Sequence, residues 1–192
     1  MELKSVNVEK KLMRKDFLEE IKKASSEKYE TNWDDEGRIG EQKKKSKIRL
    51  GSKARASGGQ FELRVRKDLE EKGWIVDKWS NNIEFGGDKN AFNKGVLVRC
   101  RPKFNPFTKR LIMNTGGFPD FLAFQLMDGG KYKIIGVEVK INGTLSRIEK
   151  EKCRWYLDNK IFNEILVARK VKEKNRVHVE YLDVKGILKR MR

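Results

Sequence analysis

Two segments, FPDFLAF at residues 118–124 and KIIGVEVK at residues 133–140, flank the stretch MDGGK at residues 127–131. Glycine adopts left-handed turn conformations without steric cost, so MDGGK is typical of a tight turn. The flanking segments are rich in the apolar and β-branched residues that favour strands. The sequence therefore predicts a β-hairpin with its tip at Gly129.

The register of this hairpin brings three charged residues together. Asp120 and Glu138 are equally distant from Gly129, so they should face each other across the ladder, where opposed side chains share a face. Lys140 lies two residues beyond Glu138 and returns to that face. Two such carboxylates can chelate a hard divalent cation, and the ammonium can orient a water or offset charge on a phosphate. A slip of one residue would separate the carboxylates, and plain solvent-exposed alternation remains the competing interpretation.

The charge balance favours a polyanionic partner. Lys and Arg number 45 against 28 Asp and Glu, which gives a net charge of +17, and nucleic acid is the commonest polyanion that such proteins bind. A membrane surface is the competitor, but no apolar run approaches the ~18 residues of a spanning helix and no signal-peptide pattern opens the chain. Cys100 and Cys153 suit reduced thiols in an intracellular, cytoplasmic protein. His178, the single histidine, fits a surface or core position better than catalysis.

The first 56 residues are expected to form an N-terminal extension. Residues 7–30 have apolar positions at helical spacing, whereas residues 31–42 are acidic and turn-like. Residues 43–55 carry seven basic residues and no acidic one. This last stretch predicts a linker or basic arm, ending at Arg55, that either tracks phosphates or is a solvated tail.

Residues 57–192 predict one domain with alternating elements. The pattern indicates a helix at about 59–72, a strand at 74–79, a helix at 145–159, and strands at 164–168 and 177–182. With the hairpin, the order helix, strand, insert, two strands, helix, two strands suits an α/β fold with a mixed sheet flanked by helices.

A basic insert at about residues 83–116 precedes Asp120 and suits a nucleic-acid surface. Its three phenylalanines, Phe92, Phe104 and Phe107, could stack on unpaired bases, although packing onto the core is the expectation for at least two of them. The expected nucleic-acid-binding residues of the insert, together with Arg55, are Lys94, Arg99, Arg101, Lys103, Lys109 and Arg110.

At the hairpin the chain resembles the PD-(D/E)xK nuclease superfamily. The resemblance rests on GFPDF at residues 117–121 and VEVK at residues 137–140. The following GTLS at residues 143–146 is similar to VRR-type nucleases and to archaeal Holliday-junction resolvases. In that branch a Gln often follows the Leu-Ser by three residues, and here the position is Glu149, which departs from the pattern. The resemblance covers roughly residues 57–183.

This resemblance implies a restriction-endonuclease-like core (α-β-β-β-α-β) and a Mg²⁺ site, with Mn²⁺ as a substitute. It implies that Asp120 and Glu138 hold the metal and that Lys140 positions the attacking water. Glu62 matches the first-helix acid that resolvase-like members add to the metal site. A glutamate in the first turn of a helix is also favoured by the helix dipole alone.

The sequence thus predicts a metal-dependent endonuclease that hydrolyses DNA. A dimeric resolvase that cuts four-way junctions is one alternative, since a symmetric junction needs two symmetric sites. From another class, a non-catalytic nucleic-acid-binding module would explain the charge but not the hairpin residues. The expected partner is nucleic acid, most of all DNA, together with a second copy of the chain if the protein is a homodimer.

Overall fold

The computed structural model describes residues 15–34, 36–86, 95–105, 110–112, 117–174 and 176–189. The chain divides into two compact units, residues 1–57 and residues 58–192, and the boundary falls within helix α2 (Lys45–Glu71).

The first unit contains a short helix and a β-hairpin. Residues 15–24 are helical. Ser25 follows the last helical residue, and its hydroxyl donates a hydrogen bond to the carbonyl oxygen of Ile21 at 3.0 Å. Strands β1 (Tyr29–Trp33) and β2 (Ile39–Lys44) then pair antiparallel. The predictions of helix up to residue 30 and of a turn-like stretch at 31–42 were therefore wrong. Acidic residues such as Glu30 and Glu41 lie within these paired strands, whose register shifts between Thr31 and Trp33.

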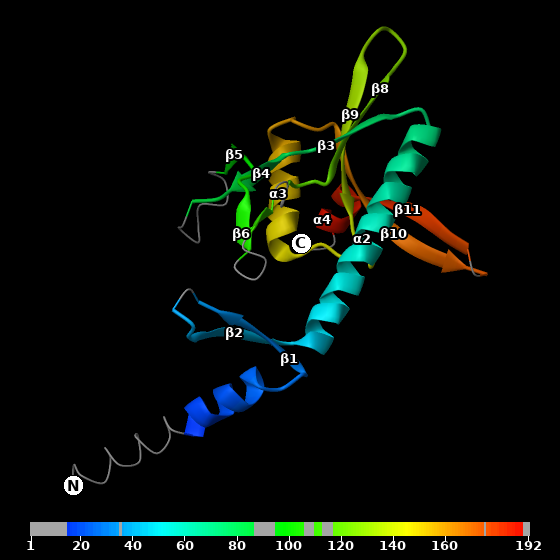
Figure 1. Ribbon diagram of the computed structural model, residues 1–192. Coiled ribbons are helices and arrows are strands. Elements are labelled where there is room, and N and C mark those ends of the chain that lie inside the picture. Colours follow the sequence, from blue (N-terminus) through cyan, green and yellow to red (C-terminus); the bar gives the residue numbers. More distant parts are fainter. Residues whose placement is uncertain are drawn as a thin grey trace. The chain divides into compact units, whose positions relative to one another are not determined.

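The stretch predicted as a basic linker or arm is helical from residue 45 onward, because residues 45–71 form the single helix α2 (Figure 1). Lys, Arg, Ala and Leu are good helix formers, so a dense positive charge does not by itself prevent a helix. Gly58 and Gly59 lie inside it, at a cost of about 1 kcal/mol each relative to alanine. None of the described residues between 15 and 57 is buried.

The second unit is built on a five-stranded mixed sheet, in the order β11-β10-β9-β8-β3. Neighbouring strands are antiparallel except for β9 and β10, which run parallel and are joined through helix α3 (Arg147–Asp158). The predicted order of helices and strands is confirmed, and the short helix α4 (Val184–Lys189) was not expected. The strands are β3 (Ile75–Lys78), β8 (Phe121–Leu126), β9 (Tyr132–Val139), β10 (Glu164–Glu173) and β11 (Arg176–Asp183).

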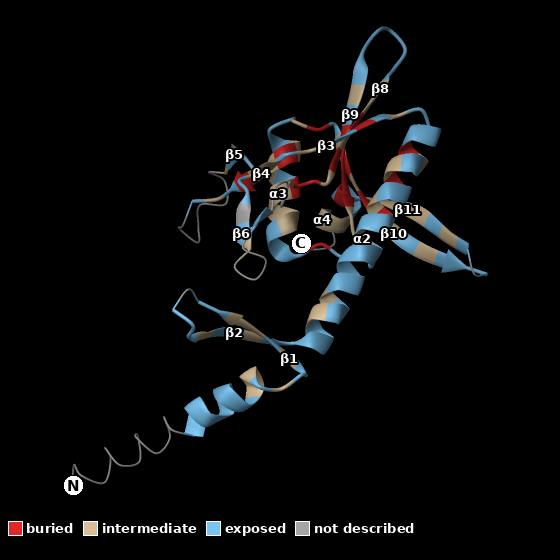
Figure 2. Cartoon of the chain, viewed as in Figure 1, coloured by how far each residue is buried: buried red, intermediate tan, exposed pale blue. Residues whose placement is uncertain are grey.

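Helices cover both faces of the sheet. On one face, Phe61, Val65 and Leu69 of α2 pack on residues of β3, β8 and β9, such as Phe121 and Val137. The other face packs against α3 and α4 in a second apolar cluster. Successive side chains along each strand point to opposite faces of the sheet, so a strand such as β10 contributes apolar residues to both clusters. In the second unit the buried residues lie along the sheet and on the helix sides that face it (Figure 2).

Two small hairpins occupy the described part of the insert. Strand β4 (Asn81–Glu84) pairs with β5 (Val96–Arg99), and β6 (Lys103–Asn105) pairs with β7 (Arg110–Ile112). Among the described helices, none has the length and apolar character needed to cross a bilayer.

Candidate functional site

The hairpin register is the one predicted. Strand β8 pairs with β9 from Phe121 opposite Val137 to Leu126 opposite Tyr132, residues equally distant from Gly129 in every pair. Asp120 immediately precedes Phe121, the first residue of these pairs. Its Oδ2 accepts a hydrogen bond from the backbone N–H of Val139 at 2.8 Å, so the side chain reaches across to the end of β9.

Asp120 is half-buried in an environment that disfavours its charge. Burial raises the pKa of the Asp120 carboxyl above its usual range, and the nearby charge of Glu62 acts in the same direction. The hydrogen bond from Val139 and the positive charges of Lys140 and Lys78 oppose this rise in pKa without cancelling it. A cation bound next to Asp120 would therefore stabilise the ionised form of this carboxylate, which burial has deprived of hydration.

Glu138 is the one buried charged residue of the described chain, with 4% of its surface exposed. Its Oε1 lies 2.9 Å from the Lys140 Nζ, whereas its Oε2 is buried without a hydrogen-bond partner. Burial, followed by the charge of Asp120, raises the pKa of Glu138 to about 8. The interpretation of this residue as part of a solvent-exposed alternation is therefore wrong.

Lys140 is held between two carboxylates. Besides Glu138, its Nζ contacts Glu149 Oε1 at 2.6 Å. Burial lowers the pKa of Lys140, but the hydrogen bonds to Glu149 and Glu138 outweigh this, so its pKa is raised and the ammonium stays protonated. Partial burial raises the pKa of Glu149, but the hydrogen bonds from Lys140 and Ser146 outweigh this and lower it.

Glu149 is a site residue whose role the sequence did not reveal. Its Oε2 accepts from the backbone N–H of Ser146 at 2.7 Å, while the Ser146 hydroxyl accepts from the Glu149 N–H, a capping box at the start of α3. One carboxylate thus caps the helix and holds the Lys140 ammonium. The spacing Ser-x-x-Glu is a known signature of helix starts and was the available signal.

A cleft of about 890 Å³ opens beside Asp120. Arg99 and Arg101, two of the predicted nucleic-acid-binding residues, line it together with Glu62 and Lys78. Further lining residues that the sequence did not single out are Trp79, Ser80, Val98, Cys100 and Pro102. The cleft therefore places two carboxylates, those of Asp120 and Glu62, beside several cationic side chains.

The walls of this cleft are joined by main-chain hydrogen bonds. The N–H of Trp79 donates to the Asp120 carbonyl at 3.2 Å, and the N–H of Cys100 donates to the Ser80 carbonyl at 2.9 Å. A Cβ atom at Gly117 would lie 1.8 Å from the Trp79 carbonyl oxygen, so no other residue fits there. Gly117 therefore permits the close approach of the Trp79 backbone.

Glu62 lies in the cleft wall on α2 and forms an ion pair with Lys78 at 3.0 Å. Within the described residues, no group of three or more His, Cys, Asp or Glu side chains is placed to hold a metal ion. Glu62 thus influences Asp120 through its charge and does not complete a three-carboxylate cluster with Asp120 and Glu138.

The remaining predicted residues are dispersed. Arg110 on β7 is exposed, Arg55 is exposed on the part of α2 in the first unit, and Lys103 belongs to β6. Lys94 and Lys109 lie outside the described residues, as do Phe92, Phe107 and the side chain of Lys103. Phe104 is 61% exposed, and His178 is an exposed residue of β11.

The residues present suit a divalent cation. The charge of Asp120 raises the electrostatic cost of ionising Glu138, and the unpartnered Oε2 of Glu138 is a buried acceptor that a cation would satisfy. Mg²⁺ is commonly held by one or two carboxylates while water and substrate phosphate complete its shell. Two carboxylates are therefore a sufficient protein contribution.

The chain matches no protein-family model, no curated protein sequence and no solved structure.

Proposed function

We propose that the second unit is a metal-dependent nuclease that hydrolyses DNA phosphodiester bonds, with a restriction-endonuclease-like core of the PD-(D/E)xK type. The observation that carries this proposal is the pair Asp120 and Glu138, two desolvated carboxylates on neighbouring strands, beside a cleft lined with arginine. The order of the helices and strands, and the motif residues at the end of the hairpin, support the assignment of the core.

Each residue has a role that follows from its surroundings. Asp120 and Glu138 would hold Mg²⁺, which when bound supplies a water that is nucleophilic near neutral pH and offsets charge on the phosphate. Lys140, fixed by Glu138 and Glu149, keeps its proton and presents a positive charge next to the carboxylates. From there it can orient the attacking water or stabilise negative charge on the phosphate.

Arg99 and Arg101 would bind the phosphate backbone in the cleft. Guanidinium groups pair with phosphate in a bidentate geometry and keep their charge at any working pH. Their positive charge offsets the repulsion between Asp120 and an approaching phosphate. The net charge of +17 adds long-range attraction for the same polyanion.

Cleavage of a substrate panel tests the proposal. Single-stranded, duplex, flap and four-way-junction DNA, and RNA, are incubated with Mg²⁺, Mn²⁺ or EDTA. Asp120→Asn should reduce cleavage by several orders of magnitude. Asp128→Asn, an exposed aspartate in the turn of the same hairpin, is the matched control and should cut like the wild type. An intact panel with both metals would refute the nuclease assignment.

Binding in EDTA separates an enzyme from a binding module. Without metal, the Asp120 carboxylate repels phosphate, so Asp120→Asn should bind DNA as tightly as the wild type or more tightly. Lys140→Ala removes an attractive charge as well as a catalytic group, so it should lose activity and gain no affinity. A module without catalysis would show these affinity changes with no metal-dependent cleavage.

A further inference from the structure

Strands β10 and β11 continue beyond the sheet as a two-stranded ribbon. Pairing of β10 with β9 is confined to Glu164–Ala168, whereas its pairing with β11 continues to Glu173 opposite Arg176. The ribbon, defined as residues 169–174 and 176–180, therefore has no third strand beside it in the described structure. Figure 1 shows this hairpin projecting from the sheet.

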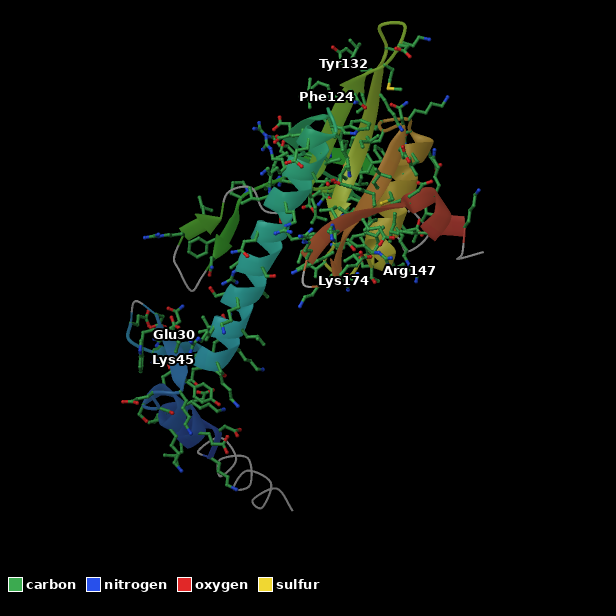
Figure 3. The ribbon with its side chains drawn as sticks, turned by 90° about the vertical axis from the view of Figure 1, so that its right-hand side faces the viewer. Glu30, Lys45, Phe124, Tyr132, Arg147 and Lys174 are labelled. Atoms are coloured by element: carbon green, nitrogen blue, oxygen red, sulfur yellow. The ribbon has the colours of Figure 1, made fainter. Side chains whose placement is uncertain are left out.

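The ribbon leaves the sheet at the end of the strands where the carboxylates of Asp120 and Glu138 lie. Because β10 runs parallel to β9, its second half extends past the end of β9, where Glu138 and Lys140 lie. Two hydrogen bonds fix this placement, from the Lys140 N–H to the Ala168 carbonyl at 2.9 Å and from the Lys170 N–H to the Ile141 carbonyl at 3.2 Å. In Figure 3, Lys174 and Arg147 lie toward one end of the sheet, and Phe124 and Tyr132 lie at the other.

The ribbon presents an excess of exposed positive charge. Glu180 is engaged by Arg169, whose guanidinium donates to both carboxylate oxygens at 3.0 and 2.9 Å. Glu173 is then the remaining acidic residue among the described ribbon positions. The exposed basic residues are Lys170, Lys172, Lys174 and Arg176.

Contacts on one side keep the ribbon in a defined direction. The Arg64 guanidinium of α2 donates to the Val177 carbonyl at 2.8 Å, near the start of β11. Val179 and Tyr181 pack against the core under α2, and the Tyr181 hydroxyl donates to Asp68 at 2.7 Å. A ribbon anchored in this way can position its cationic side chains relative to Asp120 and Glu138.

We propose that the ribbon enters the major groove of double-stranded DNA on one side of the bond that is cut. This inference rests on the proposed nuclease function and specifies its substrate as duplex DNA beside the cleavage point. A two-stranded ribbon fits the B-DNA major groove, which is about 12 Å wide, whereas the deep and narrow major groove of A-form RNA excludes it.

The length of the ribbon predicts where it binds. Residues 169–173 extend about 16 Å beyond the last residue paired with β9, at about 3.3 Å per residue. One turn of DNA is about 34 Å for 10 base pairs, so the ribbon tip reaches about 5 base pairs from the scissile phosphate. Arg99 and Arg101 lie on the β3 side of Asp120, so the duplex would have basic contacts on both flanks of the carboxylates.

The test is duplex binding in EDTA by the full chain carrying Lys170→Gln and Lys172→Gln. The matched control carries Lys131→Gln in the turn between β8 and β9 and Lys160→Gln before the start of β10, two exposed lysines whose replacement removes the same charge at the opposite end of the sheet. The ribbon variant should bind a 20-base-pair duplex about 10- to 60-fold more weakly at 0.1 M salt, since each lost phosphate contact removes up to 0.9 from the salt slope. The control variant should bind like the wild type.

Single-stranded DNA of equal length provides the second arm. It has no groove, so the ribbon and control variants should bind it with equal affinity. Equal duplex affinity of the two variants, or an equal loss on single and double strands, would overturn the inference, as would failure of the wild type to bind duplex. Because binding is measured without metal, duplex recognition without cleavage would refute the nuclease assignment and leave the ribbon assignment standing.

Discussion

Replacing Glu138 by glutamine should change how the stability of the metal-free protein depends on pH. The folded state raises the pKa of this carboxyl from 4.5 to about 8 by burial and by the charge of Asp120. Between these two values the folded chain binds more protons than the unfolded chain, so the free energy of unfolding falls as pH rises. The contribution of the protonated Glu138 carboxyl to the free energy of unfolding is fully present below pH 4.5 and is lost above pH 8.

The magnitude follows from proton linkage. Each tenfold difference in proton affinity corresponds to about 1.4 kcal/mol. A carboxyl that titrates at about 8 instead of 4.5 therefore removes at most about 5 kcal/mol of stability across this window. Glutamine has the same shape and no charge to lose, so the stability of Glu138→Gln relative to wild type should rise by several kcal/mol between pH 5 and pH 9.

Urea denaturation in EDTA at pH 5, 7 and 9 measures this difference. The control is Glu173→Gln, an exposed glutamate on β10, whose stability relative to wild type should stay constant over the same range. A Glu138→Gln variant whose stability relative to wild type is the same at pH 5 and pH 9 would refute the reasoning. In that case Lys140 alone would compensate the buried charge.

Four further outcomes are expected. Saturating Mg²⁺ should raise the thermal midpoint of the wild type at pH 8 and shift Asp120→Asn far less, since ligand at 100 times its dissociation constant adds about 2.7 kcal/mol. Arg99→Gln with Arg101→Gln should flatten the dependence of log K on log salt for DNA by about two units, measured by fluorescence anisotropy. Ser146→Ala removes the N-cap of α3 and should cost about 1 kcal/mol in urea denaturation. Gly117→Ala places a Cβ 1.8 Å from a carbonyl oxygen and should cost about 3 kcal/mol or prevent folding, as seen by circular dichroism.

Controls for these variants lie in open parts of the described chain. Gly58→Ala, in α2, meets no atom within 4 Å and should be neutral or stabilising, unlike Gly117→Ala. Lys131→Gln should leave the salt slope unchanged. An equal Mg²⁺ shift in wild type and Asp120→Asn, or an unchanged slope for the arginine variant, would contradict the respective assignment.

The hairpin was predictable because its determinants are local. A glycine-rich turn fixes the register, and the two-residue period of a strand then fixes which side chains share a face. Asp120 and Glu138 could therefore be paired from sequence. The depth of Glu138 could not, because it depends on packing across the sheet by segments distant in sequence, such as α2 and α3.

The errors also have a physical origin. Residues 43–55 have a high density of positive charge, which suggested a linker or solvated arm, but the same residue types have strong helix propensity, and residues 45–55 are part of α2. The end of β10 was predicted at residue 168, where pairing with β9 stops, whereas pairing with β11 carries it to Glu173. This continuation of β10 depends on pairing with β11 alone. The sequence of residues 169–173 therefore shows only a weak alternation of apolar and polar residues.

The main-chain hydrogen bonds beside the cleft have a consequence for engineering. The Asp120 carbonyl, Ser80 and Cys100 are tied through backbone atoms, and these hydrogen bonds do not depend on which side chain Ser80 or Arg101 carries. Positions such as Ser80 and Arg101 can therefore be randomised in a library without displacing the carboxylates. Selection at these positions offers a route to altered sequence or structure preference of the proposed nuclease on an unchanged backbone.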